Sequence, residues 1–231
     1  MKKKRKSRGP RVFALAAYDM RRAPKKQDSL KDGVELGRCD VGVFSTVRRA
    51  EKAVKRMVGE RTKAIAEGWE DDPWFGFVLV EHRLDDPFQG DGKSVWPVEF
   101  RSVRTYLGDG TLNYFSDTDG ACEKKFRGTS IPNRFGKGKF AWILRGDGRA
   151  VPTLVEAEPY TKAEWKARFK RGCSGDFTDD SGIDFPLPSG GHEHTFAPFL
   201  FPLSALPRIR IPKADKAEMR RSRDEWRKTG I

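Results

Sequence analysis

The feature that most constrains the fold is a run of apolar residues at helical spacing, placed between two apolar segments of strand length. The run begins at Val47 and continues through Ala50, Val54, Met57, Val58 and Ile65. Residues 41–44 precede it and residues 75–83 follow it, and both segments are rich in Val and Phe. We therefore predict a strand, then an amphipathic helix that starts after Ser45 and is kinked or ends near Gly59, then a second strand.

The other apolar segments are also of strand length. Val12–Tyr18 predicts a buried first strand, and Gly146-Asp147-Gly148 predicts a hairpin turn. Later strands are expected at 95–107, 138–144, 151–158 and 196–203. A short helix is predicted at 161–172 from its capping box, and an exposed charged helix at 213–228 in which Ala217, Met219 and Trp226 alone are candidates for burial.

Together these elements predict an α+β fold: a strand–helix–strand sheet unit plus a small β-barrel-like module with a short helical insertion. Residues 85–93, rich in Asp, Gly and Pro, mark the boundary between the two parts. The predicted divisions are a disordered basic arm at residues 1–10 and an α/β domain at 11–84. A β-rich barrel-like domain follows at 94–207, and a basic C-terminal helix or tail at 208–231. A chain of 231 residues is long enough for one large or two small domains.

Several short motifs resemble a domain found in uncharacterised bacterial proteins. They are Gly42-Val43-Phe44-Ser45 before the helix, Gly76-Phe77 after it, Asp109-Gly110-Thr111-Leu112-Asn113, Asp176-Phe177-Thr178-Asp179-Asp180, and His192-x-His194 followed by Phe201-Pro202. The resemblance covers about two thirds of the chain. It implies a strand–helix–strand unit followed by a small β-rich module, and it implies no particular activity.

Positive charge is concentrated at the two ends of the chain. The whole chain carries +13, of which residues 1–26 contribute +10 and residues 208–231 contribute +5, so the residues between them sum to −2. Clusters of Lys and Arg attract polyanions such as nucleic acids. The candidate nucleic-acid-binding residues are therefore Lys2, Lys3, Lys4, Arg5, Lys6, Arg8, Arg11, Arg21, Arg22, Lys25, Lys26, Arg220, Arg221 and Arg223.

Two functions from different classes fit this pattern. The first is a non-enzymatic protein that binds RNA or a ribonucleoprotein through its basic terminal arms. The second is a protein-interaction or inhibitor module whose tails keep it soluble or direct it within the cell. Aromatic residues next to cations would stack on bases in the first case and lie in the core in the second. These residues are Tyr114, Phe115, Phe126 with Arg127, and Arg134 with Phe135.

A metal-dependent hydrolase at His192 and His194 is the third hypothesis. Residues two apart on a strand face the same side, so both imidazoles can reach one metal ion. Zinc sites usually have a second well-spaced ligand pair, which is missing here, although Cys173, Asp176, Asp179 and Asp180 are further candidates. We therefore expect no bound metal and no catalytic residue, and regard an enzyme as the less favoured interpretation.

Other sequence features exclude several classes of protein. No apolar run reaches the length of about 18 residues that a membrane span needs, so we expect no membrane partner. Gly136-Lys137-Gly138-Lys139 lacks the spacing of a phosphate-binding loop, so no cofactor is expected. The three cysteines include no close pair. This favours an intracellular, cytoplasmic protein, or a nuclear one in a eukaryotic host, where Lys2 to Lys6 would act as a nuclear signal.

Overall fold

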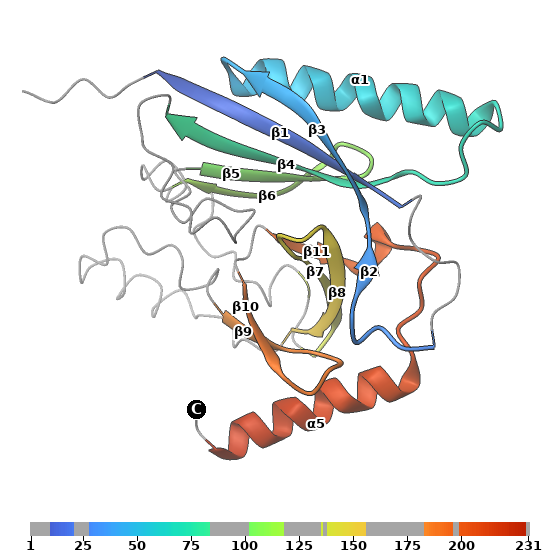
Figure 1. The fold of residues 1–231 in the computed structure, drawn as a ribbon, viewed down its shortest axis with the longest axis vertical. Helices are drawn as coiled ribbons and strands as arrows, with labels where there is room; N and C mark the ends of the chain where they lie inside the picture. The colour runs from blue at the N-terminus through green and yellow to red at the C-terminus, as the bar shows by residue number, and fades with distance from the viewer. Residues whose placement is uncertain are drawn as a thin grey trace, which may run out of the picture.

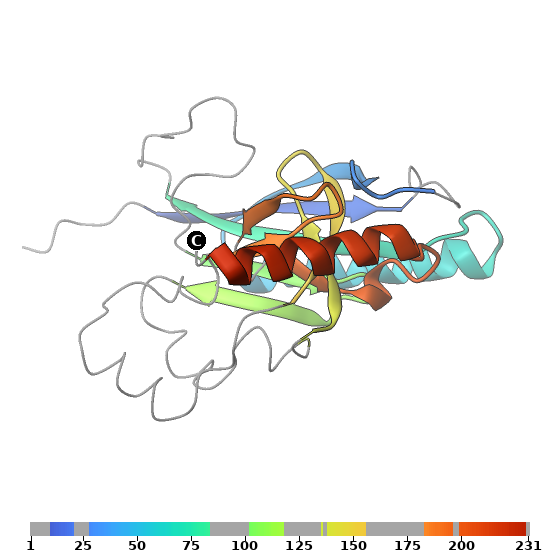
Figure 2. The same cartoon turned by 90° about the horizontal axis from the view of Figure 1, so that it is seen from below.

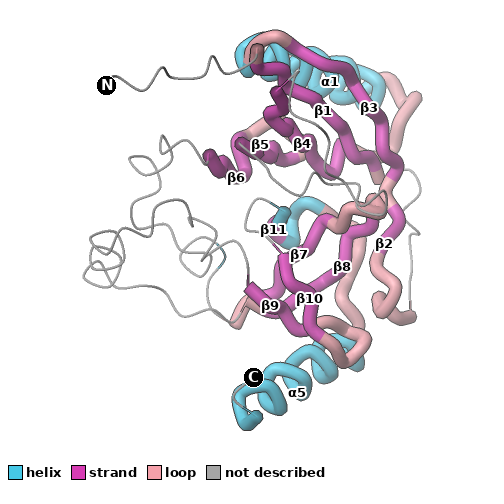
Figure 3. The backbone as a smooth tube through the Cα atoms, turned by 60° about the vertical axis from the view of Figure 1, so that its left-hand side comes forward, coloured by secondary structure: helices cyan, strands magenta, loops and turns pink. Residues whose placement is uncertain are grey.

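Figure 1 shows the computed structural model of the chain, whose described residues form an α+β fold with antiparallel sheets and two long helices. The described residues are 10–20, 28–83, 102–117, 135, 138–155, 183–195 and 199–229. They form successive layers, with a helix, a five-stranded sheet, a four-stranded sheet and a second helix following one another along the long axis (Figures 1 and 3). The predicted α+β class is confirmed.

The first sheet contains the predicted strand–helix–strand unit. Its strands, in spatial order, are β3 (Gly37–Phe44), β1 (Arg11–Asp19), β4 (Trp74–Arg83), β5 (Ser102–Leu107) and β6 (Leu112–Asp117). Each strand is antiparallel to its neighbours. Helix α1 (Val47–Ala66) connects β3 to β4, which lie on either side of β1.

Helix α1 packs on this sheet with the predicted apolar face. Ala50 and Val54 are buried, and Val47 and Met57 pack at the edge of the same cluster. The helix begins after Thr46, whose hydroxyl accepts a hydrogen bond from the backbone N–H of Arg49 at 3.3 Å. We expected the helix to be kinked or to end near Gly59. It instead continues to Ala66. One glycine costs a helix only about 1 kcal/mol, which the apolar contacts on both sides offset.

The second sheet has the spatial order β11 (Leu200–Pro202), β7 (Phe140–Leu144), β8 (Arg149–Leu154) and β2 (Val34–Glu35). The predicted hairpin is present, because β7 and β8 pair in antiparallel register up to Leu144 opposite Ala150. Gly148 in the turn has a φ of +82°, which glycine adopts without strain. A separate hairpin of β9 (Ile183–Pro186) and β10 (His192–Thr195) lies next to this sheet.

The predicted barrel-like module is not formed by the described strands. β5 and β6 extend the first sheet by pairing along β4, and β2 crosses over to pair with β8. β4 is a long strand with a buried central part, and pairing with β5 satisfies the backbone groups of its second edge. Each sheet therefore combines strands from before residue 84 and after residue 101. The boundary expected at 85–93 and the helix expected at 161–172 lie outside the described residues.

One large core fills the space between the two sheets. Phe75 of β4 and Phe201 of β11 meet there with ring centroids 4.6 Å apart. Gly76 allows this close approach, because a Cβ atom at that position would lie 2.7 Å from the ring of Phe201. The side chain of Trp142 is completely buried in the same core. The first sheet thus buries one face against α1 and the other against the second sheet.

Helix α5 (Lys213–Thr229) lies across the end of the molecule opposite α1 (Figures 1 and 2). Met219 is buried as expected, whereas Ala217 is exposed and Trp226 is partly buried. The sequence did not indicate that Asp215 would also be buried, with its Oδ2 accepting a hydrogen bond from the backbone N–H of Leu30 at 2.6 Å. Neither α1 nor α5, the two long helices of the described ranges, is apolar enough over its length to cross a membrane.

Candidate nucleic-acid interface

The structure describes four of the predicted nucleic-acid-binding residues: Arg11, Arg220, Arg221 and Arg223. The other ten are Lys2, Lys3, Lys4, Arg5, Lys6, Arg8, Arg21, Arg22, Lys25 and Lys26, and they lie outside the described residues. Arg11 is the first residue of β1, and its Nε lies 3.3 Å from Oε1 of the buried Glu81. This cation is therefore held on the sheet by a carboxylate.

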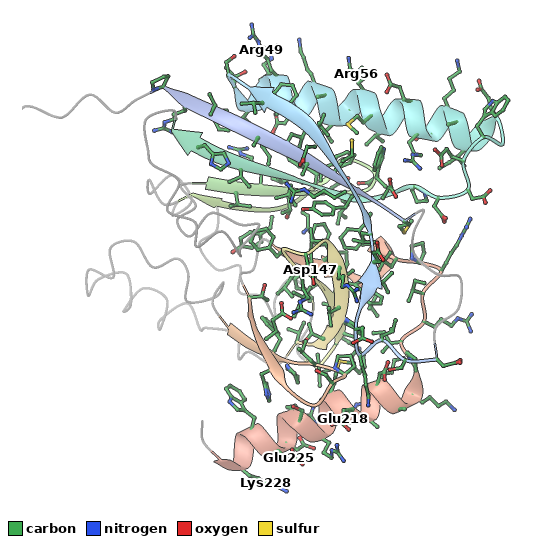
Figure 4. All side chains as sticks on the ribbon, in the orientation of Figure 1. Arg49, Arg56, Asp147, Glu218, Glu225 and Lys228 are labelled. Carbon is green, nitrogen blue, oxygen red and sulfur yellow. The ribbon has the colours of Figure 1, made fainter. Side chains whose placement is uncertain are left out.

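Two cations of α5 contact acids of the same helix. Arg221 contacts Glu218 at 2.6 Å and Glu225 at 4.0 Å, and Arg223 contacts Asp224 at 2.8 Å. Arg220 lies over the ring of Phe140, 5.5 Å from its centroid. Glu218, Glu225 and Lys228 all project from this helix (Figure 4). Arg221 and Arg223 are therefore paired with acids of α5, whereas Arg220 lies over an aromatic ring.

A dense group of exposed cations lies on α1, where the sequence had indicated no site residue. Five cations in its first half are exposed, and we call them the α1 patch: Arg48, Arg49, Lys52, Lys55 and Arg56. Arg49 and Arg56 lie on the side of the helix that faces away from the sheet (Figure 4). The same periodicity that buries Ala50 and Val54 therefore places these cations in solvent.

The acid that lies among the patch residues in sequence contacts the sheet. Glu51 is the one acid among helix residues 47–59, and its Oε1 accepts a hydrogen bond from the Tyr106 hydroxyl at 3.1 Å. The same oxygen lies 3.8 Å from Nη1 of Arg104 on β5. Burial and the Glu51 carboxylate both raise the pKa of Tyr106, which keeps its proton for this bond. Glu51 is therefore engaged by Tyr106 and Arg104 on the sheet side of the helix, and its side chain is 39% exposed.

The position of the α1 patch is electrostatically unfavourable for the helix itself. The first turn of α1 contains no acid, and it contains Arg48 and Arg49. Cations near a helix N-terminus face the positive end of the helix dipole, at a cost of about 0.3–1 kcal/mol each at low ionic strength. A bound anion would remove this repulsion. At the far end of the patch, Arg56 lies 3.8 Å from Glu60.

The N-terminal arm joins the fold next to the α1 patch. β1 and β3 are antiparallel, with Phe13 opposite Phe44, and α1 begins three residues after Phe44. The first residue of β1 and the start of α1 therefore lie at the same end of the strands of the first sheet, whereas α5 lies at the opposite end of the molecule (Figure 1). The two basic ends of the chain do not form a single surface.

The histidine pair lies on β10, but the described residues form no metal site there. The ring of His192 packs against Trp226 of α5, with centroids 5.6 Å apart. Glu193 Oε2 lies 3.3 Å from Nε of Arg145, and burial raises the pKa of Glu193 although Arg145 opposes the shift. Nowhere in the described ranges do three His, Cys, Asp or Glu side chains meet as ligands. The side chain of His194, and residues Cys173, Asp176, Asp179 and Asp180, are not among those described.

The aromatic residues that the sequence offered for base stacking divide into two groups. Tyr114 is buried in a core cluster with Ile143 and Phe185, and Phe135 packs against that cluster. Their core interpretation is supported. The side chain of Phe115, and residues Phe126, Arg127 and Arg134, lie outside the described part of the chain.

One exposed aromatic residue was not anticipated. Trp69 follows the C-terminus of α1 and is 80% exposed. Its backbone N–H donates to the carbonyl of Ala64 at 2.9 Å, which fixes the backbone of this turn. The neighbouring side chains are acidic, namely Glu67, Glu70 and Asp71. Trp69 therefore belongs to the acidic end of α1 and not to the α1 patch.

Comparison of the chain with protein families, with curated proteins and with solved structures gives no match. The resemblance to a bacterial domain therefore stays a prediction. The residues of the α1 patch are the main support for a functional proposal.

Proposed function

We propose that the protein is a non-enzymatic nucleic-acid-binding protein that holds phosphates with the α1 patch and the N-terminal arm. The observation that carries the proposal is the separation of charge on α1, with five exposed cations outside and Glu51 turned to the sheet. The sequence favours RNA or a ribonucleoprotein as the ligand. Phosphates are common to RNA and DNA, so the α1 patch supports binding to both.

The chemistry of such binding is neutralisation of phosphates and release of their counterions. Arg48, Arg49 and Arg56 can each present two parallel N–H groups to a phosphate, whereas Lys52 and Lys55 act as compact charges. Residues 1–9, which precede β1, would add the cations of the arm to those of the α1 patch. Binding of this kind carries little sequence preference, because phosphates are the same at every base.

Fluorescence anisotropy with labelled RNA and DNA at low salt tests the proposal. Reversing two charges of the patch, in a Lys52→Glu/Lys55→Glu variant, should weaken binding by at least about tenfold because two phosphate contacts become repulsive. A Lys31→Glu/Lys139→Glu variant is the matched control, since both lysines are exposed and belong to the second sheet and its loops. Its affinity should remain closer to that of the unmodified protein.

Two results would contradict the proposal. Equal weakening in the control variant would mean that only net charge matters and that the α1 patch is not the site. Absence of binding to any nucleic acid at low salt would exclude the function, and a protein-interaction module would replace it. The exposed Trp69 favours that alternative, because tryptophan is common among the residues that dominate protein interfaces.

A further inference from the structure

We infer that the α1 patch fits the major groove of a B-form DNA duplex, with one row of cations facing each phosphate backbone. The inference rests on the proposed nucleic-acid binding and specifies the form of the ligand. It depends on how the five cations are distributed around the helix.

The cations form two rows along α1. Successive residues of an α-helix are rotated by about 100°, so residues seven apart nearly coincide in direction. Arg48 and Lys55 therefore form one row, and Arg49 and Arg56 form a second row about 100° around the helix. Lys52 lies between the rows. Within each row the two residues are about 10 Å apart along the axis.

Two rows about 100° apart around a helix suit a groove with a backbone on each side. An α-helix with its side chains is about 10–12 Å across, and the major groove of B-form DNA is about 12 Å wide. A helix lying in that groove turns one row toward each strand. A single strand has one backbone and satisfies one row, and the major groove of an RNA duplex is too narrow to admit side chains.

The residues of the patch also favour phosphate contacts over base stacking. Platforms for single strands combine cations with exposed aromatic rings. The five patch residues include no aromatic side chain, and Trp69, the largest exposed apolar side chain of the described residues, lies at the opposite, acidic end of α1. Phe44, just before the helix, packs against the core cluster beneath it. The surface is therefore suited to the phosphates that flank a groove.

The test removes one row at a time. The variants are Arg48→Gln/Lys55→Gln and Arg49→Gln/Arg56→Gln, with Lys31→Gln/Lys139→Gln as the control of equal charge change. Affinity for a DNA duplex of about 20 base pairs is measured as a function of salt. Each row variant should reduce the slope of log K against log salt by about two, because two phosphate contacts are lost. The control should leave the slope unchanged.

The ligand comparison completes the test on the intact protein. A single DNA strand and an RNA duplex of the same length should each bind at least about tenfold more weakly than the DNA duplex at the same salt. The inference is overturned if the single DNA strand or the RNA duplex binds as tightly as the DNA duplex, or if only one row of cations affects the slope. In both cases the proposed binding of nucleic acid still stands. If no nucleic acid binds at all, both the inference and the proposed function fail. Thermal unfolding of each variant confirms that a loss of affinity is not a loss of fold.

Discussion

Phe13 of β1 lies directly opposite Phe44 of β3, and this pairing brings the N-terminal arm to the start of the basic helix. Residues 1–9 precede β1 along the chain, and Arg48 follows Phe44 by four residues. Two basic segments that are separated by about forty residues in sequence thus join the fold at the same end of the strands of the first sheet. Glu81 holds Arg11, the first residue of β1, at this end of the sheet.

Removal of residues 1–9 should weaken nucleic-acid binding without unfolding the protein. The deletion takes away six cations, Lys2, Lys3, Lys4, Arg5, Lys6 and Arg8, and it spares β1, which begins at Arg11. The slope of log K against log salt should flatten by several units if most of these cations contact phosphates. An Arg220→Gln/Arg221→Gln variant on α5 provides the comparison and should change the slope less. An unchanged slope after the deletion would show that the arm makes no phosphate contacts.

A Val54→Asp substitution should destabilise the fold by several kcal/mol. Val54 is 2% exposed and packs between α1 and the first sheet, where an aspartate would be an unpaired buried charge. Urea denaturation measures the loss. Lys55→Asp, at the next and exposed position, is the control and should cost less than about 1 kcal/mol. Similar losses in the two variants would mean that Val54 does not face the core.

The sequence was most informative where structure depends on local periodicity. The spacing of Ala50 and Val54 predicted both the helix and its buried face, and the turn around Asp147 predicted the hairpin. The assembly of the sheets was not predictable in this way, because pairing between β4 and β5 or between β2 and β8 depends on contacts distant in sequence. For that reason the sequence did not indicate that the described strands would form two stacked sheets in place of a barrel-like module.

The α1 patch illustrates a second limit. Arg48, Lys52 and Lys55 were visible at helical spacing in the sequence, but averaging charge over residues 27–207 gives −2 and hides them. The helical spacing of the segment already places the cations opposite the apolar face, but we selected site residues from the charge of the two ends of the chain. The orientation of Glu51 toward Tyr106 required the structure, because Tyr106 lies on another strand.

Replacement of Asp215 tests the docking of α5. Its carboxylate is 2% exposed and accepts a hydrogen bond from the N–H of Leu30, 185 residues away in sequence. Asp215→Ala leaves that N–H unsatisfied in the interior and should cost about 1–3 kcal/mol. Asp215→Asn keeps an acceptor and should cost less. Asp224→Ala, at an exposed position on the same helix, is the control. If Asp224→Ala lost as much stability in urea denaturation as Asp215→Ala, the result would argue against the buried hydrogen bond.

Tyr18→Phe should have little effect at neutral pH and should improve stability at high pH. The side chain is completely buried, and its hydroxyl has no hydrogen-bond partner among the described residues. Burial raises the pKa of Tyr18 from 10.0 to about 12. The folded protein therefore keeps this proton after the unfolded chain has lost it, so stability falls as the pH rises from 10.0 toward about 12.

Urea unfolding of the two proteins at neutral pH and at about pH 11 measures this difference. The Tyr18→Phe variant lacks the ionisable group, so its stability should fall less over that interval. Tyr106, whose pKa is also raised, is common to both proteins and cancels in the comparison. An equal fall in the two proteins, or a loss of several kcal/mol at neutral pH, would be inconsistent with a buried hydroxyl that lacks a partner.

Removal of the two arginines in the first turn of α1 should stabilise the protein while weakening its binding to nucleic acid. Arg48 and Arg49 lie at the positive end of the helix dipole, and Arg48→Gln/Arg49→Gln should raise stability by about 0.3–1 kcal/mol for each charge removed at low ionic strength. The hydrogen bond from Arg49 Nη1 to Ser45 Oγ, 3.0 Å long and exposed, reduces this gain slightly. Lys63→Gln is the reciprocal control, because Lys63 lies in the last turn of the same helix, where a cation is favourable. That variant should lose a little stability and keep its affinity. Thermal unfolding and anisotropy on the same samples decide the outcome: lower stability with unchanged affinity in the Arg48→Gln/Arg49→Gln variant would show that these arginines support the fold and not a ligand.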